Sequence, residues 1–474
     1  MKIQSLIQDK HSLVPVEVEL TLLPGLPAVH FLGLPDQHLK ESVLRIKSAI
    51  KNAGFSFPTA QQIVVNLRPS QLKKKSQGLE LAVAAAYLWK TGQIPAPVMD
   101  KDFFVYGELT LQGEVVEPRD LKSFLRSPPT TVMTGRSECG SLVPFQRWSL
   151  KHLSEMGQPE IQIASGGLLQ PVRPRHLLQK IFSKEQARLL EILALGSHSA
   201  ILAGPAGSGK STLAQVLPAL MPEPSRQEFT EIMQRQQAFG EPGNWRPVVK
   251  PHHSTPVMSM IGGGAVPFAG EISRAHQGLL ILDELLEFPS AVQEALREPL
   301  EEGRIHIVRA GRRQEFPAQI QAVATTNLCP CGDWTPEKSR QISCRFSSRR
   351  CRSYSERLSG PFLDRFQILY FTRGLGELVI SGDEILARVL RARECQKQRL
   401  SQGLEGGTLD EPSKKWLEDL VDRETMTSQR RVQALQQVAR SIADLESCQF
   451  VSSGHLQEAY DLCMMSFRRL KIGR

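Results

Sequence analysis

Two short segments carry residues whose types and spacing suit phosphate chemistry. The first segment fits the pattern GxxxxGK[ST] and reads Gly204-Pro205-Ala206-Gly207-Ser208-Gly209-Lys210-Ser211. Thr212 follows it directly. Glycines let main-chain N–H groups wrap phosphates at a helix N-terminus, the lysine reaches the β and γ phosphates, and the serine hydroxyl ligates Mg²⁺. The segment, Thr212 included, therefore predicts a site for ATP and Mg²⁺.

The second segment is an apolar run, Leu279 to Leu282, that ends in Asp283 and Glu284. An open α/β sheet binds its ligand at the carboxyl ends of its strands. We expect Asp283 to hold the Mg²⁺ shell and Glu284 to polarise the attacking water, as phosphoryl transfer requires. A strand that ends in two solvated acids is the alternative, and the phosphate loop upstream argues against it. Asn327 closes the next predicted strand and is expected to help orient the water.

The elements around these segments alternate between helix and strand, which predicts a parallel sheet of the α/β class. A P-loop core is expected over residues 176–371. After Phe371 the pattern turns helical, which predicts a helical lid over residues 372–474. The expected helices and strands of both parts are Ser183–Leu195, Ala200–Ala203, Lys210–Leu220, Leu279–Leu282, Ile320–Ala324, Asp383–Gln402, Ser413–Arg423, Gln429–Leu445 and Ser452–Leu470.

An α+β domain is expected before the core, over residues 1–167. Strands are predicted at Val14–Leu22 and Gln62–Leu67, and helices at Asp36–Ala53 and Gly78–Trp89. A segment rich in glycine and proline, from Gly166 to Arg175, then reads as a linker. The chain is therefore expected to hold three domains.

Composition restricts the class of protein. The chain has 474 residues, 41% of them apolar and 23% charged, and no apolar run approaches the roughly 20 residues that cross a bilayer. The N-terminal residues lack the apolar core of a secretory signal, so a cytoplasmic protein without a membrane segment is expected. A net charge of +9 favours a polyanionic partner, although an ordinary basic surface would give the same total.

With these motifs in place, the chain resembles the YifB/ComM family of magnesium-chelatase-like AAA+ ATPases over nearly all its length. The matching stretches are Gly33-Leu34-Pro35-Asp36, Lys40-Glu41-Ser42, Ala53-Gly54-Phe55, Val65-Asn66-Leu67-Arg68-Pro69, Pro251-His252-His253, Gly262-Gly263-Gly264, Gly270-Glu271-Ile272-Ser273, Ala275-His276, Cys329-Pro330-Cys331-Gly332 and Leu358-Ser359-Gly360-Pro361-Phe362-Leu363-Asp364-Arg365.

The resemblance implies a ring, usually a hexamer, of identical subunits. It implies that Arg365 is an arginine finger for the neighbouring subunit's nucleotide, a role that can speed transfer by roughly 10³ to 10⁵. It also implies a sensor-2 element at Ser428-Gln429-Arg430, which would put Arg430 over the phosphates, with Arg431 beside it as the alternative. A mobile insert is expected at about residues 252–273. ComM-type members are branch-migration helicases of natural transformation, so single-stranded and branched DNA are the implied partners.

The N-terminal domain resembles the protease domain of Lon, which has an S5-like fold. The nucleophile of that enzyme is missing here, because Gln77-Gly78-Leu79-Glu80 stands where its serine belongs. A Ser-Lys dyad would need Ser76, displaced from the expected turn, together with Lys122. We therefore expect a docking or ring-spacing module rather than a peptidase.

A cysteine cluster suits a zinc knuckle, with Cys329, Cys331, Cys344 and Cys351 as thiolate ligands. The spacing departs from that of the family, because Phe346 stands where the second cysteine of a close CxC pair belongs. Two interpretations of the cluster therefore stay open: a Zn²⁺ site, or reduced cysteines in a flexible loop. Residues 338–352 hold six Lys or Arg and no Asp or Glu, so the loop is a candidate phosphate contact with or without metal.

A basic hairpin is predicted at Gly303–Pro317, with Arg309, Arg312 and Arg313 near its tip. In related ring motors a hairpin at this place in the chain lines the central pore, so these arginines are candidate DNA contacts; a solvated hairpin is the alternative. A DNA motor is thus the leading hypothesis. A chelatase-like ATPase that remodels a protein is the second hypothesis, and a Lon-like protease, opposed by the missing nucleophile, is the third.

Overall fold

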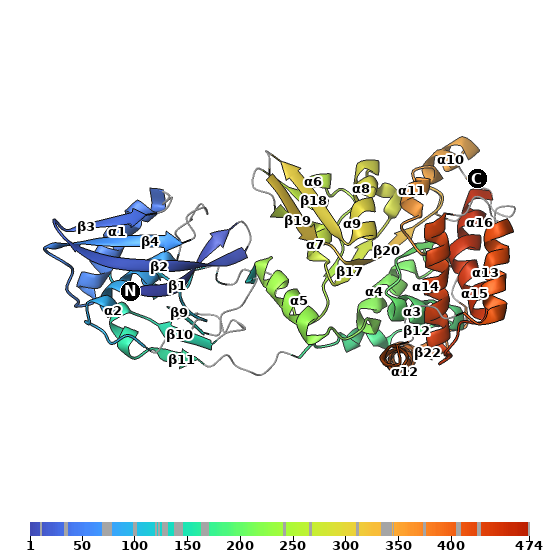
Figure 1. Cartoon of the computed structure of the whole chain (residues 1–474). Coiled ribbons are helices and arrows are strands. Elements are labelled where there is room, and N and C mark those ends of the chain that lie inside the picture. Colours follow the sequence, from blue (N-terminus) through green and yellow to red (C-terminus); the bar gives the residue numbers. More distant parts are fainter. Residues whose placement is uncertain are drawn as a thin grey trace. The chain divides into compact units, whose positions relative to one another are not determined.

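The structure is a computed structural model. It describes residues 1–9, 12–32, 37–68, 78–97, 102–118, 121, 124–125, 131–136, 146–162, 170–239, 243–264, 268–309, 312–332, 344, 346–372, 376–403, 409–423 and 428–472. The chain forms two compact units (Figure 1). Unit 1 is Met1–Gln170 with Met233–Pro242, and unit 2 is Pro171–Ile232 with Gly243–Arg474.

Unit 1 is built on a mixed sheet. Among its described residues nine strands pair in the order β11-β10-β9-β5-β1-β2-β4-β3, with β8 on β2. The bounds are β1 Lys2–Asp9, β2 Ser12–Pro24, β3 Ala28–Leu32, β4 Gln61–Arg68, β5 Phe103–Val105, β8 Phe124–Leu125, β9 Thr131–Gly135, β10 Gln146–Leu150 and β11 Glu160–Gln162. A short ribbon, β6 Glu108–Leu109 with β7 Val115–Val116, lies beside it. The strands predicted at Val14–Leu22 and Gln62–Leu67 are confirmed as parts of β2 and β4.

Two helices, α1 (Gln37–Asn52) and α2 (Leu79–Lys90), pack with this sheet, close to the predicted bounds. Small side chains let α2 lie deep in the core, and every residue from Leu79 to Trp89 is buried. Strand β4 shows the alternation of a half-covered sheet, with Ile63, Val65 and Leu67 facing the core.

The start of α2 carries a buried carboxylate. The carboxylate of Glu80 is buried and accepts hydrogen bonds from the Ser42 hydroxyl at 2.7 Å and the Leu109 amide at 2.8 Å. Arg45 pairs with it at 3.2 Å. Glu80 thus ties α1, α2 and β6 together, a structural role in which each buried oxygen has partners. Ser76 and Lys122, the pair that a peptidase would need, lie outside the described residues.

The described part of unit 2 contains a five-stranded parallel sheet in the order β14-β17-β20-β13-β21. Its strands are β14 Val248–Val249, β17 Gly278–Leu282, β20 Ile320–Thr326, β13 Ala200–Ala203 and β21 Ile368–Phe371. Alternate side chains enter two cores. Ala200 and Leu202 of β13 belong to one, and Ile201 and Ala203 belong to the other. A sheet covered on both faces explains why these strands read as continuous apolar runs.

The order of the strands brings the predicted site together. Strand β20 lies between β13, which leads into the phosphate loop, and β17, which leads to Asp283. Because all three strands are parallel, the residues that follow them meet at one edge. Helices α3 (Lys184–Gly196) and α4 (Lys210–Leu220) pack on the core of this sheet, and Ser183 caps α3 in a capping box with Gln186.

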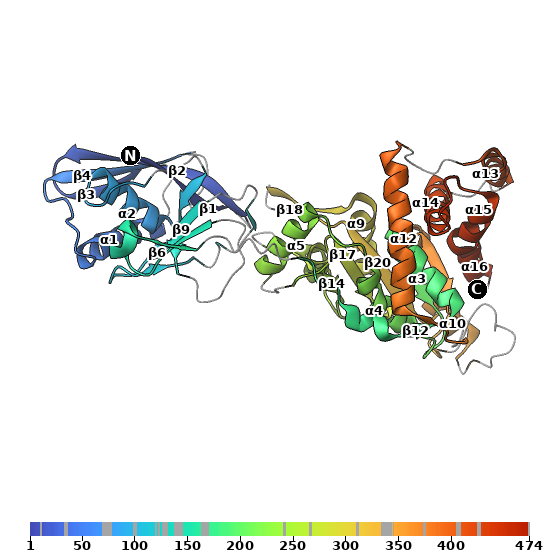
Figure 2. The ribbon, with the colours of Figure 1, turned by 90° about the horizontal axis from the view of Figure 1, so that it is seen from below.

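The rest of unit 2 is mainly helical after β21. Its helices are α12 Gly382–Ser401, α13 Glu411–Arg423, α14 Gln429–Leu445, α15 Ser453–Tyr460 and α16 Ser466–Ile472. A π-helical turn, Asp461–Met465, joins the last two, where the sequence predicts one continuous helix. Helices α12 and α14 both contact α3, as Figures 1 and 2 show. The predicted helical character of this region is therefore confirmed.

Candidate nucleotide-binding site

The phosphate loop follows β13 directly and opens α4, as its sequence predicts. Gly207 and Gly209 have φ of 74° and 86°, a conformation that favours glycine. Gly204 is required for a different reason, because a Cβ there would lie 2.2 Å from the Thr372 hydroxyl oxygen. Ser208 and Thr372 share a hydrogen bond of 2.6 Å, and the Thr372 amide donates to Ala203 at 2.8 Å. The loop is thus anchored on the residue that follows β21.

Lys210 is buried at the first position of α4. Its ammonium donates to the carbonyl oxygens of Gly204 at 2.9 Å and Pro205 at 2.7 Å, and to Asn327 Oδ1 at 3.0 Å. Burial lowers the pKa of this lysine, and the charge of Asp283 partly opposes that shift. Lys210 and Asn327, predicted from separate motifs, are therefore brought into direct contact.

Asp283 follows β17 and faces the start of α4. Its Oδ1 accepts from Thr325 Oγ1 at 2.5 Å and from Ser211 Oγ at 3.4 Å. Its Oδ2 accepts from the Lys250 ammonium at 2.7 Å. Burial raises the pKa of Asp283, but the hydrogen bonds from Lys250 and Thr325 outweigh it and hold that pKa below its ordinary value. The carboxylate is consequently ionised at neutral pH, as an Mg²⁺ ligand must be.

Glu284 adopts φ 56° and ψ 52°, a left-handed conformation that is costly for a residue with a Cβ. Its amide donates to Thr325 Oγ1 at 3.2 Å, and its side chain is exposed. Backbone strain of this kind persists where surrounding contacts fix it, and it is common at functional sites. Thr325 thus orients both carboxylate residues.

Sequence reasoning missed two polar residues of this site. Thr325 enters the sequence argument only as part of the tripeptide before Asn327, and Lys250 does not enter it. Lys250 directly follows β14, the edge strand next to β17, so its place at the carboxyl end of a parallel strand was the available signal. A strand of two residues gives no periodicity by which to find it.

A cavity of about 350 Å³ lies beside the loop. It is lined by the start of α3 and by the residues around the end of β21: Ser183, Lys184, Glu185, Gln186, Tyr370, Gly376, Glu377 and Val379. The side-chain nitrogen of Gln186, Nε2, is 3.6 Å from the position that a Cβ of Gly209 would take, so the cavity adjoins the phosphate loop. Its volume is in the range of small-ligand pockets.

Arg365 and Arg430 meet on one carboxylate. Arg365 Nη2 lies 2.5 Å from Glu301 Oε2, and Arg430 Nη2 contacts the other oxygen, Oε1. Arg431 has a different environment, because it is buried and donates to the carbonyl oxygens of Leu363 and Phe366 and to Asp364. Packing therefore separates the two adjacent arginines into a structural one, Arg431, and a partly exposed one, Arg430.

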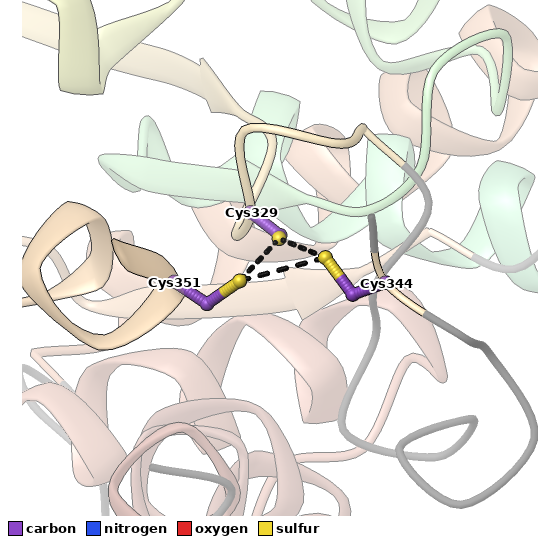
Figure 3. A group of neighbouring side chains, drawn as sticks. All are labelled: Cys329, Cys344 and Cys351. Carbon is purple, nitrogen blue, oxygen red and sulfur yellow. Dashed lines mark hydrogen bonds between the residues drawn. The ribbon is translucent and has the colours of Figure 1, made fainter. Parts of the chain in front are cut away.

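The cysteine cluster brings three thiols from distant positions together (Figure 3). The sulfur of Cys329 lies 3.5 Å from that of Cys344 and 3.2 Å from that of Cys351, and the last two are 3.5 Å apart. Cys331 hydrogen bonds to Cys329. Burial raises the pKa of Cys329, whereas the Phe346 amide lowers the pKa of Cys344 to about 7. Thiolates around tetrahedral Zn²⁺ lie about 3.8 Å apart, so the three sulfurs of this cluster are close enough to share one metal ion. Cys331 is not a member of this close group.

The same cluster is connected to the phosphate loop. The Ala206 amide donates to the Gly332 carbonyl at 2.8 Å, and the Gly332 amide donates to Cys329 at 3.0 Å. Gly332 has φ 84°, so the turn after Cys331 favours glycine. The Cys-Pro-Cys-Gly segment is thus a support of the loop as well as a source of thiols.

The predicted hairpin is present as β18 (Arg304–Arg309) and β19 (Arg312–Pro317). Their register pairs Arg309 with Arg312 and Val308 with Arg313, so these arginines lie at the turn end of the ribbon. Residues 310–311 lie outside the described part. The predicted insert contains α6 (Val257–Ile261), the pair β15 (Gly262–Gly263) and β16 (Phe268–Ala269), and α7 (Glu271–Arg274).

Comparison with known proteins agrees with this geometry. Residues 178–377 match the family described as magnesium chelatase, subunit ChlI, residues 16–127 match subunit ChlI of Mg-chelatase, and residues 380–462 match the ChlI C-terminal family. The uncharacterized protein YifB of Escherichia coli is 34% identical, covering 94% of this chain and 93% of its own. Competence protein ComM of Haemophilus influenzae is 33% identical with the same coverage. The chain belongs to the YifB/ComM family of magnesium-chelatase-like proteins.

The magnesium-chelatase family is an AAA+ ATPase family, and the α/β core with its phosphate loop is consistent with that membership. YifB of Salmonella typhimurium is a further relative, 34% identical over 94% of this chain and 93% of its own. In the part of the chain that the structure describes, helices are either too short or too polar to cross a membrane.

Proposed function

We propose that this YifB/ComM-family chain is an ATP-hydrolysing ring motor that acts on DNA. The observation that carries the ATPase part is the group of contacts at one sheet edge, where Lys210 bonds to Asn327 at 3.0 Å and Ser211 to Asp283 at 3.4 Å. Residues 1–167 would be a Lon-protease-like module without peptidase activity, residues 176–371 the motor core, and residues 372–474 the lid.

The residues divide the work of hydrolysis between them. Amides of Gly204 to Thr212 would hold the phosphates, and Lys210 would exchange its loop carbonyls for phosphate oxygens. Ser211 and Asp283 would ligate Mg²⁺, which supplies charge neutralisation between the phosphates. Glu284 would take the proton of the attacking water, which Asn327 would orient. The cavity beside Gln186 would receive the base.

Hydrolysis would be completed across a subunit interface. In this proposal Arg365 and Arg430 serve the nucleotide of a neighbouring subunit in a homo-oligomeric ring, expected to be a hexamer. Zn²⁺ held by Cys329, Cys331, Cys344 and Cys351 would fix the turn that carries Gly332, whose carbonyl accepts from the Ala206 amide at 2.8 Å.

DNA is proposed as the substrate of the motor because the sequence is rich in basic residues at the hairpin and in the cysteine loop, residues 338–352. The net charge of +9 supports a polyanionic partner. The relative from H. influenzae is named a competence protein, which favours branched DNA and branch migration during transformation in the cytoplasm. Contacts from Arg309, Arg312 and Arg313 would be to phosphates, so they would be independent of sequence and sensitive to salt.

The test compares wild type with the double variant Arg312→Ala, Arg313→Ala. ATP hydrolysis is measured without DNA and with single-stranded, double-stranded and forked DNA, and single-strand binding is measured at several salt concentrations. We expect DNA to stimulate the wild type. The double variant should assemble normally and lose the stimulation. Its binding should also depend less on salt, because each arginine that no longer neutralises a phosphate lowers the slope of log affinity against log salt by about 0.7 on a single strand.

Two outcomes would contradict the proposal in different ways. Unchanged DNA binding and stimulation in the double variant would remove the hairpin from the mechanism and direct attention to the basic cysteine loop. A wild type that DNA neither binds nor stimulates would favour the second function, a chelatase-like ATPase that remodels a protein, which the match to the ChlI family also supports.

A further inference from the structure

The carboxylate of Glu301 is the meeting point of three distant parts of the chain. Glu301 lies in α9 (Arg297–Glu302), which follows β17 and Asp283 in the chain. One of its oxygens contacts Arg365 at 2.5 Å, and the other contacts Arg430, which is 129 residues away in the chain. Neither the phosphate-loop chemistry nor the family motifs gave Glu301 a role.

The surroundings keep the two arginines together. Arg431, adjacent to Arg430 at the start of α14, donates to the carbonyls of Leu363 at 2.8 Å and Phe366 at 3.0 Å, and to Asp364 at 3.1 Å. The ring of Phe467 lies 3.6 Å below its guanidinium. These contacts hold the start of helix α14 against the residues that flank Arg365. They therefore fix the position of the Arg430 backbone relative to Arg365.

We propose that Glu301 is a positioning residue that holds Arg365 and Arg430 as one pair of cations for a neighbouring subunit's nucleotide. This inference rests on the proposed function, in which the arginines act across the interface. Two guanidinium groups at such short range repel each other, and a carboxylate between them with one oxygen for each offsets that repulsion.

Burial explains why Arg365 depends on this carboxylate more than Arg430 does. The side chain of Arg365 is only 12% exposed, compared with 38% for Arg430. Its other described hydrogen bond is a long one, 3.3 Å from Nη1 to the Pro361 carbonyl. A poorly exposed guanidinium that loses its carboxylate partner must move or remain uncompensated. Each arginine has five N–H donors, so the bond to Glu301 leaves donors for phosphate oxygens.

The decisive variant is Glu301→Gln, which keeps the shape of the side chain. Its amide can accept from one arginine but presents N–H donors to the other, so the bridge is broken. Glu302→Gln, the next residue in the same helix, is the matched control, because it removes the same charge and has no role in this proposal. Glu301→Asp keeps the charge and shortens the reach.

We expect Glu301→Gln to retain wild-type nucleotide affinity and ring assembly and to lose about tenfold to a hundredfold in kcat, because small misplacements of catalytic groups cost about that much. Glu301→Asp should recover part of the rate, and Glu302→Gln should match the wild type. A kcat of Glu301→Gln at or above the wild-type value would overturn the inference. A higher rate in particular would mean that the carboxylate restrains the arginines instead of presenting them.

Mixed rings separate a positioning role from general damage. Lys210→Ala subunits cannot bind nucleotide but still offer their arginines, so mixing them with Glu301→Gln subunits should restore some hydrolysis. No restoration would place the defect in the variant's own nucleotide site and refute the proposal. Arg365→Ala run in parallel tests the proposed function itself, because full turnover in that variant would remove the finger whatever Glu301 does.

Discussion

Lys250 offers a quantitative test of the candidate metal site. Its ammonium lies 2.7 Å from Asp283 Oδ2, while Thr325 and Ser211 contact the other carboxylate oxygen. Because Asp283 is the proposed Mg²⁺ ligand, a bound metal ion would compete with this lysine for the charge of the same carboxylate. Lys250→Met removes the competing charge and keeps most of the length of the side chain.

The size of the effect follows from exposure. The side chains of Lys250 and Asp283 are 49% and 30% exposed, so solvent screens the pair strongly. Exposed ion pairs of this type contribute about 0.2 to 1 kcal/mol. Since about 1.4 kcal/mol corresponds to a tenfold change in an equilibrium constant, the variant should need less Mg²⁺ by about 1.4-fold to fivefold.

The assay is the Mg²⁺ concentration that gives half-maximal ATP hydrolysis at saturating ATP, with metal-free nucleotide affinity measured in chelator as a second readout. Lys414→Met is the control, since Lys414 forms an exposed ion pair with Glu411 at 2.5 Å in another helix. An increased Mg²⁺ requirement in Lys250→Met, or weaker binding of metal-free nucleotide, would refute the competition and assign the lysine to the phosphates. An unchanged requirement would show that the pair contributes nothing.

The remaining predictions concern the catalytic carboxylate and the thiols. Lys210→Ala should abolish nucleotide binding, whereas Glu284→Gln should bind nucleotide and lose turnover, because only the second spares the phosphate contacts; equal loss of binding in both would contradict the assigned roles. For the thiols, elemental analysis of purified protein should find about one zinc per chain, released by thiol modification, and metal-free protein would exclude the zinc knuckle.

The sequence predicted the central elements of unit 2 well because their signals are long or tightly constrained. The bounds predicted for β13, α4 and α14 are those observed. A strand covered on both faces must be apolar throughout, and a phosphate loop must be followed by a helix, so few alternatives fit. The last helix was wrong in detail, since periodicity does not reveal the π-helical turn at Asp461–Met465.

Contacts between segments that lie far apart in the sequence could not be predicted in the same way. The pairing of Lys250 with Asp283 depends on the neighbouring positions of β14 and β17 in the sheet. The hydrogen bond between Ala206 and Gly332 depends on a turn that returns to the loop from β20. Both follow from the order of the strands, which local patterns do not specify.

The adjacent arginines and the irregularly spaced cysteines are candidate functional residues whose positions the sequence alone could not predict. Arg430 and Arg431 are the same residue type, so the sequence does not distinguish them. Successive positions on a helix point about 100° apart, and the side chain of Arg431 is the one that is buried. Asp364, Leu363 and Phe366 accept hydrogen bonds from Arg431, which leaves Arg430 to contact Glu301.

Cys351 lies on helix α10 (Ser348–Ser355), and its sulfur still comes within 3.5 Å of that of Cys344. A helix can therefore bring a thiol into a cysteine cluster even when its spacing in the sequence departs from the family pattern.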